Sequence, residues 1–465
     1  MRFDRPRVVI AGLRGGSGKT TLSIGLARAL NRWGKRVAVF KKGPDYIDAG
    51  WLSKAAGREC YNLDPFLIPD ETITKSFLFH SRDAEISLIE GNRGIFDGVN
   101  IEGSFSTAEL AKRINAPVVL VLDCTKVTRT TAAILKGIES FDPELALAGV
   151  ILNNIAGQRH ESIIRGSIQE YTDLEVIGSI RRIKEEFMPE RHLGLLPHAE
   201  HPDVESVIKS LSDMVTESVD VNRLIEIAEG AGPLDHEGPI DPYIPQKSRG
   251  ADVRIGIIRD RAFQFYYPEN MRSLLRAGAE LVEVDALREP RLPEIDALYI
   301  GGGFPETNAI ELSKNRGFMK SLKEAVEDGL PVYAECGGLM YLGRSISYKE
   351  SLFEMCGVLP LDFEIRDRPV AHGYTVVEVE RENPYYPAGI QLKGHEFHYS
   401  RVIDRPMDDI EFLFKMIRGK GISGRRDGII YKNVLATYTH LHALGCPEWI
   451  DAMIDAARRY RGLRL

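Results

Sequence analysis

The sequence predicts two α/β domains joined by a linker, and three observations support this fold class. In the first half of the chain, short apolar runs alternate with segments of helical length. Continuous apolar strands separated by helices are typical of a parallel sheet that is covered on both faces. Residues 231–250 then contain four prolines and little apolar periodicity, which is typical of a linker. A second alternation of strand-like and helix-like segments begins at Val253.

The candidate strands are short runs rich in β-branched and aliphatic residues. They lie at residues 8–11, 37–40, 86–89, 118–121 and 150–152 in the first half, and at 253–258, 280–284, 297–300, 331–334 and 434–438 in the second. Between residues 361 and 430 the pattern is less regular, although residues 374–380 alternate as in a strand. We therefore expect a first domain at residues 1–230, a linker at 231–250 and a second domain at 251–465.

Composition and charge indicate a globular cytoplasmic protein. Of the 465 residues, 43% are hydrophobic and 27% are charged, and the net charge of −7 lacks the basic character of a nucleic-acid binder. The five cysteines are scattered without a C-x-x-C pair, which argues against disulfides or a structural zinc site and favours a reducing cytoplasm. No signal peptide and no run of about 18 apolar residues is recognisable, so we expect no membrane partner.

A glycine-rich segment at residues 12–20, with the sequence GLRGGSGKT, follows a candidate strand and precedes a candidate helix. Glycines let backbone N–H groups turn toward phosphate oxygens at the start of a helix. In such a loop Lys19 reaches the β and γ phosphates, and the Thr20 hydroxyl binds Mg²⁺. We therefore predict a site for ATP and Mg²⁺ formed by Gly12, Gly15, Gly16, Ser17, Gly18, Lys19 and Thr20.

The spacing of this loop is unusual. A strict P-loop has glycine five residues before Gly18, where this chain has Leu13, so the loop is one residue longer. The longer loop resembles that of dethiobiotin synthetase and its relatives, which activate a carboxylate with ATP. It also resembles the loop of partition and division-site ATPases, whose signature lysine would fall at Arg14. The loop alone does not choose between these two classes.

Charged side chains follow the next two candidate strands. The segment GPDYID at residues 43–48 follows the second strand, and EGNRGIFDG at residues 90–98 follows the third. The carboxyl ends of parallel strands form the ligand-binding edge of a doubly wound sheet, so these groups should meet there. The alternative for each acid is a solvated loop carboxylate. The predicted Mg²⁺ ligands are Thr20, Asp48 and Glu90. The residues predicted to contact the substrate and the transferred phosphoryl group are Lys42, Asp45 and Asp97.

A second candidate site lies in the second domain. The segment VYAECGG at residues 332–338 predicts a strand, a sharp turn at Cys336 and the start of a helix. Small residues at Ala334 and Gly338 leave room for such a nucleophile elbow, and a helix N-terminus favours the thiolate. The alternative is a buried cysteine without a chemical role.

Two further segments complete this candidate site. Residues 301–303 are three glycines that follow a candidate strand, and their backbone N–H groups suit an oxyanion hole. The segment THLH at residues 439–442 follows the last candidate strand and supplies a histidine as the base for the cysteine. The predicted oxyanion-hole residues are Gly302, Gly303 and Gly337.

The longer loop, GPDYID and EGNRGIFDG together resemble the motifs of the cobyrinate a,c-diamide synthase family, which Ni-sirohydrochlorin a,c-diamide synthase shares. The cysteine segment resembles class I glutamine amidotransferases of the cobyrinate and cobyrate synthase type, so the resemblance covers most of the chain. It implies a dethiobiotin synthetase-like P-loop domain with a parallel sheet, followed by a class I glutamine amidotransferase-like α/β domain.

The resemblance also implies an activity, which is ATP- and glutamine-dependent amidation of the a and c acetate carboxylates of cobyrinate in cobalamin biosynthesis. Cys336 would release ammonia from glutamine, and ATP with Mg²⁺ would phosphorylate the carboxylate that the ammonia then attacks. The expected partners are cobyrinate or a related tetrapyrrole, L-glutamine and ATP. The sequence also leaves open whether the protein forms a homodimer, because relatives of the first domain often dimerise.

One departure from the class I pattern concerns the base. The family motif places His440 first, so we choose it over His442. Most class I enzymes carry a glutamate two residues after the base, where this chain has His442. The third member of the catalytic triad is therefore unassigned, and a cysteine–histidine dyad is the alternative. The segment GHEFH at residues 394–398 resembles another family motif, but its chemistry assigns it no role.

Other functions stay open from the sequence. The chain could amidate Ni-sirohydrochlorin, or it could amidate four other side chains as a cobyrate synthase does. It could also be a partition-type ATPase switch with an appended binding domain. Such a switch has no need for Cys336 or for the GPDYID segment. Glutamine hydrolysis that depends on Cys336 would therefore separate the two classes.

Overall fold

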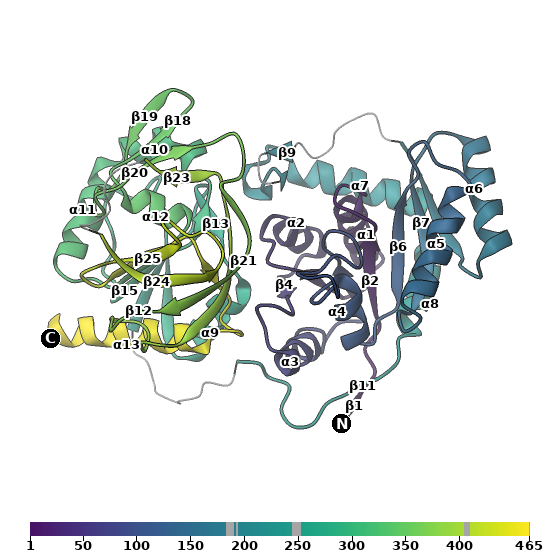
Figure 1. Ribbon diagram of the computed structural model, residues 1–465, viewed down its shortest axis with the longest axis horizontal. Helices are drawn as coiled ribbons and strands as arrows, with labels where there is room; N and C mark the ends of the chain where they lie inside the picture. Colours follow the sequence, from purple (N-terminus) through teal and green to yellow (C-terminus); the bar gives the residue numbers. More distant parts are fainter. Residues whose placement is uncertain (183–189, 192–193, 244–252, 404–409, 465) are drawn as a thin grey trace. The chain divides into compact units, whose positions relative to one another are not determined.

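The computed structural model describes residues 1–182, 190–191, 194–243, 253–403 and 410–464. They form two units, Met1–Pro242 and Tyr243–Leu465, and each has its own main sheet (Figure 1). Part of the expected linker, residues 244–250, lies outside the described residues. The part before it holds β11 (Leu234–Asp235), which pairs with β1 (Arg2–Phe3) and ties this segment to the first unit.

The first unit is built around one parallel sheet. Among its described residues, seven strands are hydrogen-bonded in the order β4-β3-β5-β2-β6-β7-β8, and each neighbouring pair is parallel. Their bounds are β2 (Arg7–Gly12), β3 (Val37–Lys42), β4 (Cys60–Leu63), β5 (Ile86–Glu90), β6 (Val118–Asp123), β7 (Leu147–Ile155) and β8 (Val176–Arg181). The three strands β2, β3 and β5 are buried along their whole length. The predicted parallel sheet is confirmed, and β4 and β8 are strands that the apolar pattern did not predict.

Helices cover both faces of this sheet. Their bounds are α1 (Lys19–Arg32), α2 (Ile47–Ala56), α3 (Asp70–His80), α4 (Thr107–Arg113), α5 (Thr130–Phe141), α6 (Gln158–Tyr171), α7 (Val204–Ser218) and α8 (Val221–Glu229). In Figure 1, α1 and α2 lie on one side of β2 and β6, and α5 and α6 lie on the other. Because β3, β5 and β2 are neighbours, the segments after them meet at one edge of the sheet, where ligands bind in open α/β folds.

The second unit contains a mixed sheet. Among its described residues, ten strands follow the order β14-β12-β15-β17-β26-β25-β24-β21-β22-β27. The parallel half consists of β12 (Val253–Ile258), β14 (Ala279–Val284), β15 (Ala297–Ile300), β17 (Val332–Glu335) and β26 (Val434–Thr437). The antiparallel half consists of β21 (Ala371–Val379), β22 (Gln391–His398), β24 (Glu411–Arg418), β25 (Arg426–Tyr431) and β27 (His440–Leu441).

The antiparallel half explains the irregular pattern between residues 361 and 430. Antiparallel sheets often bury one face more than the other, so buried and exposed positions alternate along a strand. In β21, Thr375, Val377 and Val379 are buried, whereas the residues between them are partly exposed. Such strands lack the continuous apolar runs that identified the parallel half.

Smaller elements surround the mixed sheet. The remaining strands include β13 (Phe263–Phe265), β16 (Gly302–Gly303), β18 (Ser345–Tyr348), β19 (Ser351–Glu354), β20 (Asp362–Ile365) and β23 (Ser400–Val402). The helices are α9 (Pro268–Arg276), α10 (Ala309–Lys314), α11 (Arg316–Glu327), α12 (Gly337–Leu342) and α13 (Pro447–Arg464). Of the helices in the described ranges, none combines the length and the apolar character that a bilayer crossing requires.

Candidate active sites

The glycine-rich loop connects β2 to α1 and takes its shape from its glycines. Gly16 and Gly18 have φ of 71° and 92°, in the left-handed region that favours glycine. A Cβ added at Gly12 would stand 2.3 Å from Ser17 Oγ, so the chain approaches itself closely there. A Cβ added at Gly15 or Gly16 would meet no described atom within 4 Å. The outer side of the loop therefore leaves room for a phosphate group.

The ammonium group of Lys19 folds back over this loop. Its Nζ donates to the backbone oxygens of Arg14 at 2.9 Å and Arg93 at 3.0 Å. Burial lowers the pKa of Lys19, and the charge on the neighbouring Lys41 lowers it further. Both effects disfavour the charged form, and an anion placed beside Nζ would offset them.

Four side chains meet at the carboxyl edge of the sheet. Thr20 Oγ1 donates to Glu90 Oε1 at 2.6 Å and lies 3.3 Å from Asp48 Oδ2. Lys41 Nζ lies 2.6 Å from Asp48 Oδ2 and 2.7 Å from Glu90 Oε1. The structure thus brings the three predicted Mg²⁺ ligands together. It adds Lys41, which the sequence analysis did not single out.

Charge in this acid cluster of Thr20, Lys41, Asp48 and Glu90 is compensated within the protein. The side chains of Lys41 and Glu90 are 2% and 0% exposed. Burial opposes the charge on Lys41, but Asp48 and Glu90 outweigh that effect and hold the pKa of Lys41 above its ordinary value. Burial also raises the pKa of Glu90. The second oxygen of Glu90, Oε2, is buried and has no hydrogen-bond partner among the described residues.

The acid cluster fits a bound Mg²⁺ ion. Mg²⁺ binds oxygen ligands, and the Thr20 hydroxyl with the carboxylates of Asp48 and Glu90 supplies them. The Oε2 atom of Glu90 is a buried oxygen that such an ion would satisfy. Within the described ranges, no three His, Cys, Asp or Glu side chains form a metal site by themselves. The cluster therefore suits an ion that nucleotide phosphates also hold.

Asp45 and Asp97, predicted for the substrate and phosphoryl group, both support the backbone. Asp45 Oδ1 accepts a hydrogen bond from Asp48 N at 2.8 Å at the start of α2. Burial, and then repulsion from Asp48, raises the pKa of Asp45 to about 7. Asp97 is exposed, and its Oδ2 accepts a hydrogen bond from Gly94 N at 2.9 Å. Their predicted contacts with substrate stay predictions.

Lys41 and Asn153 are the residues near this site that the sequence analysis missed. Lys41 and Lys42 end β3, and successive strand side chains point to opposite sides. Lys41 enters the acid cluster, whereas burial lowers the pKa of Lys42 and Asp64 partly offsets this. Alternation alone does not say which of two adjacent lysines joins the acid cluster, and the predicted contact of Lys42 with the substrate stays a prediction. Asn153 Nδ2 donates to Ser17 O at 3.0 Å and so fastens β7 to the glycine-rich loop.

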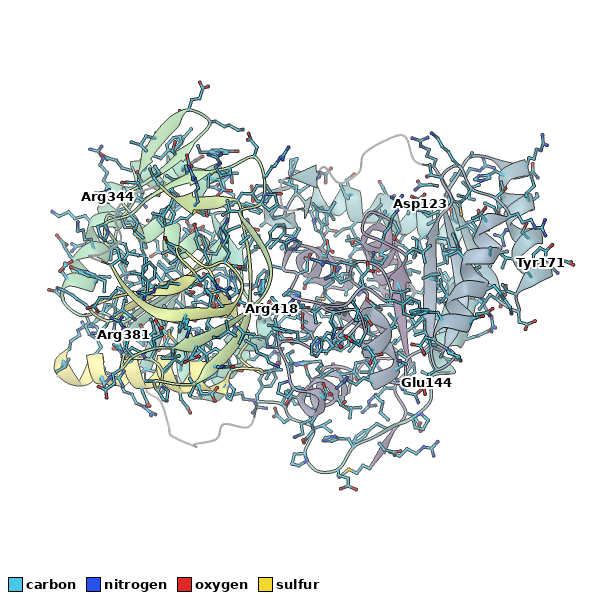
Figure 2. All side chains as sticks on the ribbon, viewed as in Figure 1. Asp123, Glu144, Tyr171, Arg344, Arg381 and Arg418 are labelled. Carbon is cyan, nitrogen blue, oxygen red and sulfur yellow. The ribbon has the colours of Figure 1, made fainter. Side chains whose placement is uncertain are left out.

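Arg14 occupies the place of the signature lysine of partition ATPases, and it pairs within its own unit. Its guanidinium donates to Asp123 Oδ2 at 2.6 Å. Asp123, labelled in Figure 2, ends β6 and also accepts hydrogen bonds from Thr125 and Asn154. Arg14 is thus attached to the carboxyl edge of the sheet.

Cys336 lies at the sharp turn between β17 and α12. Its φ of 48° and ψ of −95° are strained for a residue that carries a side chain. Parallel pairing of β17 with β26 sets Glu335 opposite Thr437, and Cys336 N donates to Thr437 O at 2.7 Å. Burial raises the pKa of the Cys336 thiol, so the thiol needs a neighbouring base to become a thiolate.

The glycine segment after β15 lies against the start of α12. A Cβ added at Gly337 would stand 3.0 Å from Gly303 N, and Gly338 N donates to Gly301 O at 3.2 Å. A Cβ added at Gly303 would stand 2.0 Å from Ala262 O, so only glycine fits this approach. These contacts bring the predicted oxyanion-hole residues beside the elbow, where N–H groups can receive the charge of a tetrahedral intermediate.

Of the two candidate bases, His440 is the one beside the glycine segment. A Cβ added at Gly302 would stand 2.6 Å from His440 Cε1 and 3.3 Å from its Nε2. On the other side of the ring, His440 Nδ1 lies 3.2 Å from Glu335 Oε2, a partner that the sequence analysis missed. His442 instead lies beside a different carboxylate, with Nε2 at 3.7 Å from Glu269 Oε1.

The GHEFH segment lies at the end of β22 and packs against His440. The rings of His395 and His440 stack with centroids 4.9 Å apart, and burial lowers the pKa of His395. Glu396 accepts hydrogen bonds from the backbone nitrogens of Lys420 and Gly421 at 2.6 and 2.9 Å. The segment therefore supports the imidazole of His440 and fixes the turn between β24 and β25.

Two family models match the chain. One is described as a CobQ/CobB/MinD/ParA nucleotide binding domain and matches residues 8–195. The other is described as a CobB/CobQ-like glutamine amidotransferase domain and matches residues 254–447. The fold and the two sites thus define a class, which is a glutamine amidotransferase preceded by a nucleotide-binding domain.

Proteins named cobyrinate a,c-diamide synthase match nearly the whole chain. That of Magnetococcus marinus is 40% identical over 452 residues, which are 97% of this chain and 96% of its own length. That of Archaeoglobus fulgidus is 42% identical over 443 residues, 95% of each chain. That of Dehalococcoides mccartyi is 40% identical over 461 residues, 98% of this chain and 99% of its own. The chain belongs to the cobyrinate a,c-diamide synthase family, which confirms the resemblance seen in its motifs.

Proposed function

We propose that the protein amidates the a and c acetate carboxylates of cobyrinate, using ATP and the amide nitrogen of glutamine. One observation carries the proposal: a phosphate-binding loop with an acid cluster and a cysteine–histidine site lie on separate units of one chain. Two such sites suit a reaction in which one produces ammonia and the other activates a carboxylate. Relatives of that name match the chain over nearly its full length.

In the second unit, the proposed chemistry is glutamine hydrolysis. The Cys336 thiol loses its proton to His440 and attacks the side-chain carbonyl of glutamine. The N–H groups of Gly303 and Gly337 stabilise the oxyanion that forms. His440 returns the proton to the departing nitrogen, which leaves as ammonia and a glutamyl thioester remains. Water then cleaves the thioester to glutamate and restores the thiol.

In the first unit, the proposed chemistry is carboxylate activation. A substrate carboxylate attacks the γ phosphorus of ATP, ADP leaves, and an acyl phosphate forms. Ammonia then attacks the acyl carbon and expels phosphate, which leaves the amide. The glycine-rich loop and Lys19 hold the phosphates. Thr20, Asp48 and Glu90 would hold Mg²⁺, which supplies charge neutralisation on those phosphates when it is bound.

The identity of the macrocyclic substrate needs a test of its own, because Ni-sirohydrochlorin a,c-diamide synthase shares the motifs. The test offers cobyrinate and Ni-sirohydrochlorin in parallel to the purified protein with ATP, Mg²⁺ and glutamine, and follows the products by mass. Two successive amidations of cobyrinate alone support the proposal. Amidation of the nickel compound alone would assign the other substrate, and no amidation of either would reject both.

A further inference from the structure

The carboxylate of Glu335 is fully buried in the second unit, and three polar groups contact it. Leu441 N donates to Oε1 at 3.1 Å, Tyr299 OH donates to Oε2 at 2.8 Å, and His440 Nδ1 lies 3.2 Å from Oε2. The side chains of Glu335 and His440 are 0% and 3% exposed. Burial of a carboxylate costs free energy unless hydrogen-bond partners satisfy its oxygens, and both oxygens of Glu335 have such partners.

We propose that Glu335 is the third member of the glutaminase site and positions His440, an inference that rests on the glutamine hydrolysis proposed above. An ionised carboxylate only accepts hydrogen bonds, so the proton of the neutral imidazole stays on Nδ1. The lone pair is then on Nε2, the nitrogen on the side of Gly302. When the thiol transfers its proton, the imidazole becomes positive, and the buried carboxylate stabilises that charge.

The strand pairing explains how the residue before the nucleophile reaches the base. Glu335 ends β17 and lies opposite Thr437 at the end of β26. The chain turns after Thr437 and enters β27 at His440, which brings Nδ1 to the Glu335 carboxylate. In the proposed site, Glu335 at the end of β17, the sheet neighbour of β26, takes the role of the glutamate that most class I enzymes carry two residues after the base.

Glu269 provides a matched control for this inference. It is also 0% exposed and also lies beside a buried histidine, with Oε1 at 3.7 Å from His442 Nε2. The ring of His442 packs against Tyr267 with centroids 4.6 Å apart. If the loss of any buried carboxylate simply loosened the core, Glu269→Gln and Glu335→Gln would have the same effect.

The experiment measures glutamine hydrolysis by the full-length protein in the presence of ATP and cobyrinate. We expect Glu335→Gln to lower kcat about 10²-fold or more and to change the KM for glutamine less than about threefold. Glu335→Asp, which keeps the charge, should recover part of kcat, and Glu269→Gln should stay within about threefold of the wild type.

A double variant tests whether Glu335 acts through the base. In a His440→Ala background, Glu335→Gln should cause no further loss, because the two residues work as a unit. Equal losses in Glu335→Gln and Glu269→Gln, or full additivity with His440→Ala, would overturn the inference. A wild-type protein that hydrolyses no glutamine would instead reject the proposed function itself.

Discussion

Lys41 and Lys42 are consecutive in the sequence, yet they have different electrostatic surroundings. Lys41 bridges the carboxylates of Asp48 and Glu90, which hold its pKa high against the effect of burial. Lys42 has a lowered pKa because burial dominates, and Asp64 only partly offsets it. At the scale of single residues, the direction of a strand side chain decides which lysine joins the acid cluster.

The bridging role of Lys41 predicts a large loss of stability in Lys41→Met. Removal of one partner from a buried ion pair leaves uncompensated charge and should lower the unfolding free energy of the first unit by about 3–5 kcal/mol. Chemical denaturation measures this loss, and added Mg²⁺ should restore more stability to the variant than to the wild type.

Lys112 is the control for Lys41. It also contacts two carboxylates, Glu109 at 2.9 Å and Asp142 at 3.0 Å, but its side chain is 25% exposed. Lys112→Met should therefore cost less than about 1 kcal/mol, as for surface ion pairs. A similar small cost for Lys41→Met would show that the acid cluster does not depend on its buried cation.

The raised pKa of Asp45 predicts a pH-dependent stability. Burial and repulsion from Asp48 raise that pKa from 3.8 to about 7, so the folded state binds this proton more tightly than the unfolded state. The stabilising contribution of the protonated group is full below the unfolded pKa and is lost as pH rises to about 7.

Asp45→Asn keeps the oxygen that accepts the Asp48 N–H but cannot ionise. Thermal unfolding of both proteins between about pH 4 and pH 8 tests the prediction. The Tm of the variant should rise relative to that of the wild type up to about pH 7 and keep a constant difference above it. Two curves that stay parallel over the whole range would contradict the assignment.

At the scale of elements, strands with a continuous run of β-branched and aliphatic residues could be predicted, and strands without such a run could not. The short strand β4 contains Asn62, whose Nδ2 donates to Gly43 O at 2.8 Å and Asp45 O at 3.0 Å. This polar residue supports the GPDYID segment, and it interrupts the apolar run that would have marked the strand. The antiparallel strands were unclear because their burial alternates.

The candidate sites could likewise be predicted only where residues close together in the sequence define them. The glycine-rich loop and the elbow depend on neighbours in the sequence, so their motifs were recognisable. The contact between Glu335 and His440 joins residues 105 positions apart, and it forms only because β17 and β26 pair in parallel. No local spacing encodes such a contact, which is why the third member of the triad could not be assigned from the sequence.

The close approach of the glycine segment to the base predicts the effect of Gly302→Ala. The added Cβ would stand 2.6 Å from His440 Cε1, so the imidazole must move. A misplacement of about 1 Å costs on the order of 10²-fold, and we expect glutaminase kcat to fall about 10- to 100-fold. Amidation driven by an ammonium salt should stay unchanged.

Gly462→Ala is the control for this change, because an added Cβ there meets no described atom within 4 Å. It should leave glutamine hydrolysis unaltered. If Gly302→Ala also hydrolysed glutamine at the wild-type rate, the glycine segment would not border the working base.

At the scale of the whole molecule, each unit has its own sheet and its own candidate site. In the first unit the site lies at the carboxyl ends of neighbouring strands β3, β5 and β2, and in the second it lies at the ends of β15, β17 and β26. Both placements follow the general position of ligand sites in parallel sheets. We therefore propose that each unit carries out one half-reaction and that mutation can separate the two half-reactions.

The most direct test of that claim measures amide formation on cobyrinate with ATP and Mg²⁺, supplying nitrogen as glutamine or as an ammonium salt. Cys336→Ser should abolish amidation with glutamine and keep it with ammonium, because the P-loop site on the other unit is intact. Lys19→Ala should lose amidation with both nitrogen sources, because we propose that Lys19 holds the phosphates of ATP during phosphoryl transfer. Equal loss of both activities in Cys336→Ser, or wild-type amidation with ammonium in Lys19→Ala, would contradict the account.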